Sequence, residues 1–100
     1  MLKYVALGSQ EELLVDVSDR TAGMTTITGG KHEVKKLADN SWQVGTGAYA
    51  GAVASTSSGL TIISSINTAG WAVGDYALYV WFQVAGNNVR KGPHYFSVVA

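Results

Sequence analysis

The chain has no cysteine among its 100 residues. A disulfide framework and a thiolate metal site are therefore excluded, and stability has to come from packing or from association. This composition suits a reducing or redox-indifferent compartment. Proline is almost as scarce, since Pro93 is the only one. Because proline is a common blocker of edge strands, most of the chain lacks that protection against pairing with another strand.

Long hydrophobic runs are also absent. The amino terminus has only a short apolar stretch, too brief for the hydrophobic region of a signal peptide, so we expect no secretion by that route. No uninterrupted apolar run approaches the roughly 18 to 20 residues that a membrane span requires, and Asp75 breaks the best candidate. We therefore expect a soluble protein with no membrane partner.

Charge is scarce in the second half of the chain. Residues 1–50 carry five Lys or Arg and six Asp or Glu, whereas residues 51–100 carry only Asp75, Arg90 and Lys91. One explanation is that this half supplies central strands whose residues lie inside. The strand expected at residues 76–84 is apolar or aromatic on both faces, however, so either a second layer of the same chain or another subunit has to cover its outer face.

The only basic cluster is Lys31, Lys35 and Lys36, and acidic neighbours dilute it. A nucleic-acid surface normally has a stronger positive stripe, so this cluster indicates a solvated strand face and no nucleic-acid partner.

Catalytic and cofactor signatures are missing. The chain has no Gly-x-Ser-x-Gly motif, phosphate-binding loop or dinucleotide fingerprint, although serine and glycine abound. His32 and His94 are far apart and lack metal-ligand spacing, so we interpret each as a surface or strand-face residue. Asp16 and Asp19 lack the glycine and glutamate that complete a calcium loop. We therefore predict no catalytic residues, no metal, no cofactor and no enzyme.

Consecutive short strands organise the chain. Alternation and turn residues predict strands at residues 2–7, 13–17, 24–28, 31–37, 41–44 and 60–66. Residues 31–38 also fit a short helix by the spacing of their apolar positions, but their length and flanking residues favour a strand. Residues 45–59 are almost wholly Gly, Ala, Ser and Thr, interrupted by Tyr49 and Val53. This composition predicts a long loop or a flat edge strand that another chain could approach closely.

The most informative stretch runs from residue 67 to residue 99. Residues 70–76 form a turn that leads into a strand of β-branched and aromatic residues at 76–84. Residues 86–88 then tolerate positive φ and connect to a last extended segment at 89–99, where Pro93 predicts a bulge or kink. The pattern indicates a hairpin of the last two strands in a small antiparallel sandwich, and 100 residues suffice for one such domain.

The segment Thr68-Ala69-Gly70-Trp71-Ala72-Val73-Gly74-Asp75-Tyr76, followed by alternating apolar residues, resembles the corner and strand of bacterial and phage immunoglobulin-like domains. In that family a tyrosine at the start of the penultimate strand bonds nearby backbone through its hydroxyl. The resemblance implies an all-β immunoglobulin-like antiparallel sandwich over residues 1–100. It places Tyr76 at a corner with Trp71 and Gly74, and Trp42 as the buried tryptophan of an earlier strand.

Short, cysteine-free chains of this type occur among the virion proteins of tailed bacteriophages, and this sequence is similar to them in style. The resemblance implies a non-enzymatic structural protein of capsid decoration, tail or baseplate, made in the host cytoplasm. Its partners would be a major capsid or tail protein and copies of itself. It departs from antibody domains in lacking both cysteines, and residues 45–59 have no counterpart that aligns.

The aromatic residues suggest where a partner would bind. If Tyr76 and the alternating apolar residues after it face the core, Tyr79 and Trp81 point to the opposite face. Together with Tyr49 they form the candidate interaction surface. Three interpretations stay open: cover by the same chain, a protein interface, or a platform for carbohydrate or a cell-surface ligand. A flat apolar patch would favour assembly, whereas an acidic or polar rim would favour ligand binding.

Overall fold

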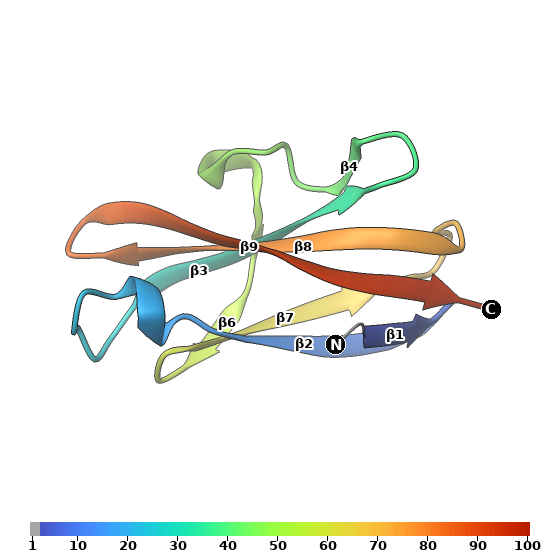
Figure 1. Ribbon diagram of the computed structural model, residues 1–100. Coiled ribbons are helices and arrows are strands. Elements are labelled where there is room, and N and C mark those ends of the chain that lie inside the picture. The colour runs from blue at the N-terminus through green and yellow to red at the C-terminus, as the bar shows by residue number, and fades with distance from the viewer. Residues whose placement is uncertain (1–2) are drawn as a thin grey trace.

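The computed structural model describes residues 3–100, which form a domain built almost entirely of strands (Figure 1). The strands are β1 (Lys3–Ala6), β2 (Gln10–Asp16), β3 (Thr28–Lys36), β4 (Ser41–Val44), β5 (Val53–Ala54), β6 (Thr56–Ser58), β7 (Thr61–Asn67), β8 (Gly74–Val84) and β9 (Asn87–Val99). Two single-turn 3-10 helices, η1 (Ser18–Arg20) and η2 (Tyr49–Gly51), complete the elements. The described chain holds no helix long and apolar enough to cross a membrane.

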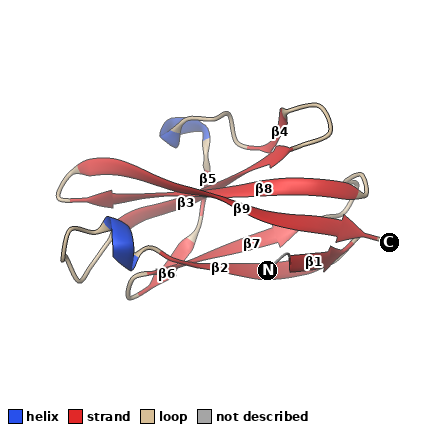
Figure 2. Cartoon of the chain, viewed as in Figure 1, coloured by secondary structure: helices blue, strands red, loops and turns tan. Residues whose placement is uncertain are grey.

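The strands form two sheets that pack face to face as a sandwich, as predicted (Figure 2). The larger sheet has the order β1-β9-β8-β3-β4, with β5 added to β3, and the smaller sheet has the order β2-β7-β6. All pairings are antiparallel except that of β1 with β9, which is parallel. Both long strands of the predicted terminal hairpin, β8 and β9, therefore lie inside the larger sheet.

Alternation along β8 places one face of the larger sheet in the core. Tyr76, Leu78, Val80 and Phe82 are buried, as predicted. Since side chains on a strand alternate between its two faces, the residues between them point outward. The smaller sheet contributes the facing layer of the core through Leu13, Val15, Ile62 and Ile66.

The predicted corner forms around Tyr76. Its buried hydroxyl donates a hydrogen bond of 2.7 Å to the carbonyl of Ala72, four residues upstream. Trp71 packs against the Tyr76 ring with 5.0 Å between centroids and closes that end of the core together with Phe96. Gly74 begins β8 with a φ of 149°, a conformation that suits glycine.

Trp42 does not take the predicted place in the core. It lies half-buried on β4, on the outer side of the larger sheet, and Trp71 occupies the position beside Tyr76. The reason is the register of β3 with β4, which pairs Trp42 with Lys35 and not with an inward residue.

Replacing Tyr76 with phenylalanine is expected to lower the free energy of unfolding by about 1 to 3 kcal/mol, because the change leaves the carbonyl of Ala72 without its hydroxyl partner. Urea denaturation monitored by circular dichroism measures the loss. Tyr4, which is largely exposed, provides the matched control, and its replacement by phenylalanine should change stability little. Equal losses in the two variants would contradict a role for the corner hydrogen bond.

The connections differ from the predictions in two places. Residues 24–27 form no strand, and β3 begins at Thr28, because Ile27 packs into the core from an irregular segment. The hairpin turn between β8 and β9 is Ala85-Gly86, both at positive φ, and the two asparagines that follow already belong to β9. The predicted bulge near Pro93 is confirmed by a register shift between β8 and β9.

The small-residue stretch at 45–59 is neither one loop nor one edge strand. It contains η2, pairs with β3 of the larger sheet through β5, and then pairs with β7 of the smaller sheet through β6. The stretch thus crosses from one sheet to the other, and its first part lies over the outer face of the larger sheet (Figure 1). This crossing positions Tyr49.

Candidate functional site

The outer face of β8 carries Tyr79 and Trp81, as predicted, but the same chain partly covers both rings. The ring of Trp42 meets Tyr79 edge-on with 5.9 Å between centroids, and the ring of Tyr49 meets Trp81 in the same way at 6.1 Å. Both Tyr79 and Trp81 are half-buried. The structure therefore brings the three predicted interaction residues together and adds Trp42 to them.

A buried carboxylate lies at the centre of these rings. Glu33 on β3 is 0% exposed. Its Oε1 accepts a hydrogen bond of 3.1 Å from the indole Nε1 of Trp81 and forms an ion pair of 3.0 Å with Nη2 of Arg90. Its Oε2 accepts a hydrogen bond of 2.9 Å from the backbone nitrogen of Gly47. Donors thus reach both oxygens, which is what a carboxylate removed from water requires.

Two glycines let the backbone approach this carboxylate closely. Gly45 and Gly47 both have φ of 88°, in the region that side chains rarely adopt. A Cβ on Gly45 would lie 2.7 Å from Cβ of Glu33, and one on Gly47 would lie 3.0 Å from the Trp42 ring. The glycine-rich composition at the start of residues 45–59 therefore serves to close the chain over Glu33.

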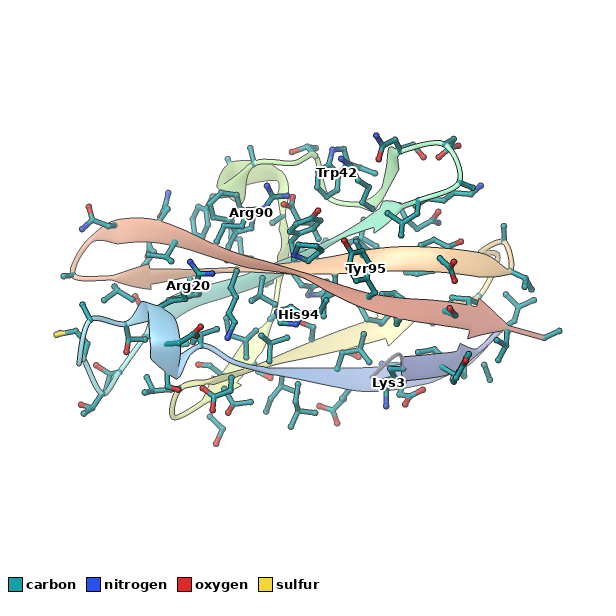
Figure 3. All side chains as sticks on the ribbon, in the orientation of Figure 1. Lys3, Arg20, Trp42, Arg90, His94 and Tyr95 are labelled. Carbon is teal, nitrogen blue, oxygen red and sulfur yellow. The ribbon has the colours of Figure 1, made fainter. Side chains whose placement is uncertain are left out.

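Three cations lie over the aromatic rings. Nζ of Lys31 is 4.3 Å from the centroid of Tyr49, and Nζ of Lys35 is 5.1 Å from that of Trp42. The guanidinium of Arg90 lies 4.0 Å from the centroid of Tyr79. Trp42 and Arg90 project from the same side of the larger sheet in Figure 3. We call this surface the aromatic-cation face; its members are Lys31, Glu33, Lys35, Trp42, Tyr49, Tyr79, Trp81 and Arg90.

Sequence reasoning missed three central members of this face, namely Glu33, Trp42 and Arg90, and the contact of Lys35 with an aromatic ring. One signal was present: Lys31, Glu33 and Lys35 alternate along one strand, so all three share one face. Register then places Lys31 opposite Trp81 and Glu33 opposite Tyr79. The basic cluster is thus a stacked arrangement over aromatic rings and not only a solvated strand face.

His32 is a strand-face residue, one of the two predicted alternatives, and it lies on the inward face of β3. It is 4% exposed and points into the sandwich, where its Nδ1 lies 2.6 Å from Oγ of Ser55. That hydroxyl lies 3.1 Å from Oγ of Ser64 on the facing sheet. This placement follows from strand alternation, because His32 pairs with the inward residue Val80. His94 is half-buried on β9. Within residues 3–100, no three His, Asp or Glu side chains gather in a metal-binding group.

Acidification from about pH 7.5 to about pH 5 is expected to lower the free energy of unfolding. Burial lowers the pKa of His32, and burial followed by the charge of Lys91 lowers the pKa of His94. Below the ordinary histidine pKa of about 6.5 the unfolded chain therefore binds more protons than the folded chain, which favours unfolding. Urea midpoints at the two pH values measure the effect. The paired changes His32→Gln and His94→Gln should flatten the dependence, and a stability that rises on acidification would contradict it.

Comparison with known proteins finds no matching family model, no matching curated protein and no matching solved structure. Function therefore has to be argued from the surface itself.

Proposed function

We propose that the chain is an immunoglobulin-like domain that acts as a non-enzymatic docking module in the assembly of a tailed-phage virion, as part of the capsid decoration, tail or baseplate. The order of the strands in the two sheets and the bond from Tyr76 to Ala72 support the immunoglobulin-like assignment. The resemblance of residues 68–76 to phage domains of this kind supports the setting.

The observation that carries the docking function is the charge of the aromatic-cation face. Three cations lie over its rings, whereas its one carboxylate is buried and already paired. With three cations and one carboxylate, the face carries two positive charges that no acidic group of the face balances. A partner that suits this face has an acidic protein surface with apolar groups between its carboxylates. Aromatic and arginine side chains are the residues that contribute most at such interfaces.

Repetition would make such a contact durable. A single exposed ion pair or cation-ring contact contributes only about 0.5 to 1 kcal/mol. When many copies dock on one particle, the binding events after the first become effectively intramolecular and modest contacts add up. A structural role in a repeating particle therefore fits a face of this strength.

A carbohydrate-binding module is the second candidate, because the rings have a polar rim and not a flat apolar surround. A cation lies within about 6 Å of each ring, however, the distance at which cations interact with aromatic faces. A neutral sugar would have to displace these cations to stack on the rings. The geometry therefore favours an acidic protein surface over a neutral glycan.

A charge reversal with a matched control tests the proposal. Lys35→Glu reverses the charge over Trp42, and Lys36→Glu makes the same change one residue later, on the other side of β3. The probe is a short polyglutamate peptide, titrated by calorimetry against each protein at low salt. We expect Lys35→Glu to weaken binding about tenfold, because like charges then oppose each other, and Lys36→Glu to have little effect.

Two further probes separate the alternatives. A neutral cello-oligosaccharide that binds when polyglutamate does not would assign the face to carbohydrate. A heparin oligosaccharide that binds alone would assign it to an acidic glycan. Failure of polyglutamate to bind the unaltered protein, or equal weakening by Lys36→Glu, would contradict docking of an acidic protein surface.

A further inference from the structure

A cavity of about 350 Å³ opens between β2 and β9, away from the aromatic-cation face. Its floor is apolar and includes Leu13, Val15, Leu78 and Phe96, while Lys3 and His94 also line it. Figure 3 shows His94 between the ribbons of β9 and β2, with Lys3 near β1. The cavity therefore lies where an edge of one sheet faces an edge of the other. We call it the edge slot.

The rim of the edge slot is an unpaired strand edge. β2 pairs with β7 on one side and with no other strand of the described chain. Just outside the two ends of β2, the backbone nitrogen of Val17 donates to the carbonyl of Leu60, and the backbone nitrogen of Thr68 donates to the carbonyl of Ser9. Because the register of β2 with β7 is continuous from residue 10 to residue 16, the odd-numbered residues of β2 direct their backbone groups toward β7. The even-numbered residues, including Glu12 and Leu14, direct their backbone groups away from β7.

Ionic contacts bound this edge at both ends. Lys3 on β1 forms an ion pair of 2.8 Å with Glu11. At the other end, Nζ of Lys91 on β9 donates to the carbonyl of Asp16 at 2.6 Å and meets Oδ1 of Asp19 at 2.7 Å. The bond from Lys91 also shows that the carbonyl of Asp16 points away from β7. About four residues of β2 remain between the two contacts, which corresponds to roughly 13 Å of strand.

The edge slot combines two kinds of surface. The backbone groups of Glu12 and Leu14 point away from β7, and no strand of the described chain pairs with them, so they call for hydrogen-bonding groups spaced along an extended chain. The apolar floor calls for a side chain between those groups. His94 also lines the slot, but its Nε2 is buried and is therefore not a contact point for a partner.

We propose that the edge slot binds an extended peptide segment of a partner protein, which adds to the smaller sheet as a strand beside β2. Backbone groups of the segment pair with those of Glu12 and Leu14, and an apolar side chain enters the slot above Leu13 and Val15. A basic residue suits Glu12, for which the described structure contains no ion pair.

Charge disfavours a second copy of β2 as the occupant. β2 carries Glu11, Glu12 and Asp16 and no basic residue. Two such strands side by side would bring acidic residues together, which is destabilising. Leu14 is 66% exposed on the outer side of the same strand, so a peptide strand would also cover an apolar side chain that is now in water.

Amide hydrogen exchange with a designed probe tests this proposal. The probe is a capped hexapeptide of alternating valine and threonine with one lysine. Its control has the same sequence with N-methyl groups on alternate residues, which removes the donors that face β2. Saturating probe should slow exchange of the Glu12 and Leu14 amides at least tenfold, and the control should leave both rates unchanged.

The outcomes also separate the edge slot from the aromatic-cation face. Lys35→Glu should bind the probe as the unaltered protein does, so either proposal can fail without the other. Unchanged exchange of Glu12 and Leu14 at saturating probe would overturn the inference. If the Glu12 and Leu14 amides exchange slowly without any probe and light scattering gives the mass of a dimer, the edge belongs to an interface with a second copy. That result would also overturn the inference.

Discussion

Replacing Arg90 with alanine is expected to lower the free energy of unfolding by about 3 kcal/mol, at the lower end of the range for breaking a buried ion pair. Glu33 is 0% exposed, and Arg90 is the only cation of the described structure that forms an ion pair with it. Without the guanidinium, the carboxylate stays buried with only neutral donors. The lower end of the range applies because the side chain of Arg90 is itself 35% exposed, which lets water reach the pair.

Two controls isolate this effect in urea denaturation. Lys91→Ala removes the next cation on β9, whose side chain is only 19% exposed but whose partner Asp19 is 59% exposed, so it leaves no buried charge unpaired and should cost less than Arg90→Ala. Combining Arg90→Ala with Glu33→Gln should recover part of the stability, because a neutral amide is less costly to bury than an unpaired charge. Equal losses from the two cations, or a double variant less stable than Arg90→Ala alone, would show that Glu33 does not organise this face.

Replacing Trp81 with serine is expected to lower the free energy of unfolding by about 3 to 5 kcal/mol and to weaken docking as well. The indole packs against Tyr49, and its nitrogen donates to Glu33. The sequence alone placed Trp81 on a candidate interaction surface and left open whether the same chain covers it. In the structure the indole also donates to a buried carboxylate, so one substitution removes both packing and a hydrogen-bond donor. Thermal and urea denaturation measure the loss.

A gentler variant separates the two contributions. Trp81→Phe keeps a smaller aromatic ring and removes the donor to Glu33, so we expect a loss of about 1 to 3 kcal/mol, less than for Trp81→Ser. Tyr95→Ser is the matched aromatic control, because Tyr95 lies exposed on β9 and should matter little to stability. Wild-type stability in Trp81→Ser would contradict the view that Trp81 supports the buried carboxylate.

Local patterns predicted the fold well where one strand's own alternation decides the outcome. Alternation counted from the corner residue Tyr76 gives the buried face of β8, although residues 76–84 are apolar or aromatic on both faces. The turn residues Asp39-Asn40, between the strands predicted at 31–37 and 41–44, are typical of the hairpin that β3 and β4 form. The bond from Tyr76 to the carbonyl of Ala72 is local too, because only four residues separate the two. Such features need no knowledge of which strands are neighbours.

The features that were missed depend on register between strands. Trp42 faces outward because a bulge between Val34 and Lys35 sets how β4 pairs with β3. Glu33 is buried because Trp81 on β8 and Arg90 on β9 both contact its carboxylate. These two residues are far from Glu33 in the sequence, so no local periodicity predicts the contacts. His32 turns inward to meet a serine from the sheet-crossing stretch. From the sequence alone, a charged or polar residue in a short strand is assigned to the solvent-facing side, because its cross-strand partners are not known.

The most direct test of the central claim uses the three tryptophans as reporters. Each indole N–H gives its own signal in a proton-nitrogen correlation spectrum, and only Trp42 and Trp81 belong to the aromatic-cation face, whereas Trp71 packs at the Tyr76 corner. Titration with polyglutamate should shift the signals of Trp42 and Trp81 in the unaltered protein and leave Trp71 in place. The shifts should be lost in Lys35→Glu and kept in Lys36→Glu. A spectrum in which Trp71 moves while Trp42 and Trp81 do not would contradict the claim that this face is the docking surface.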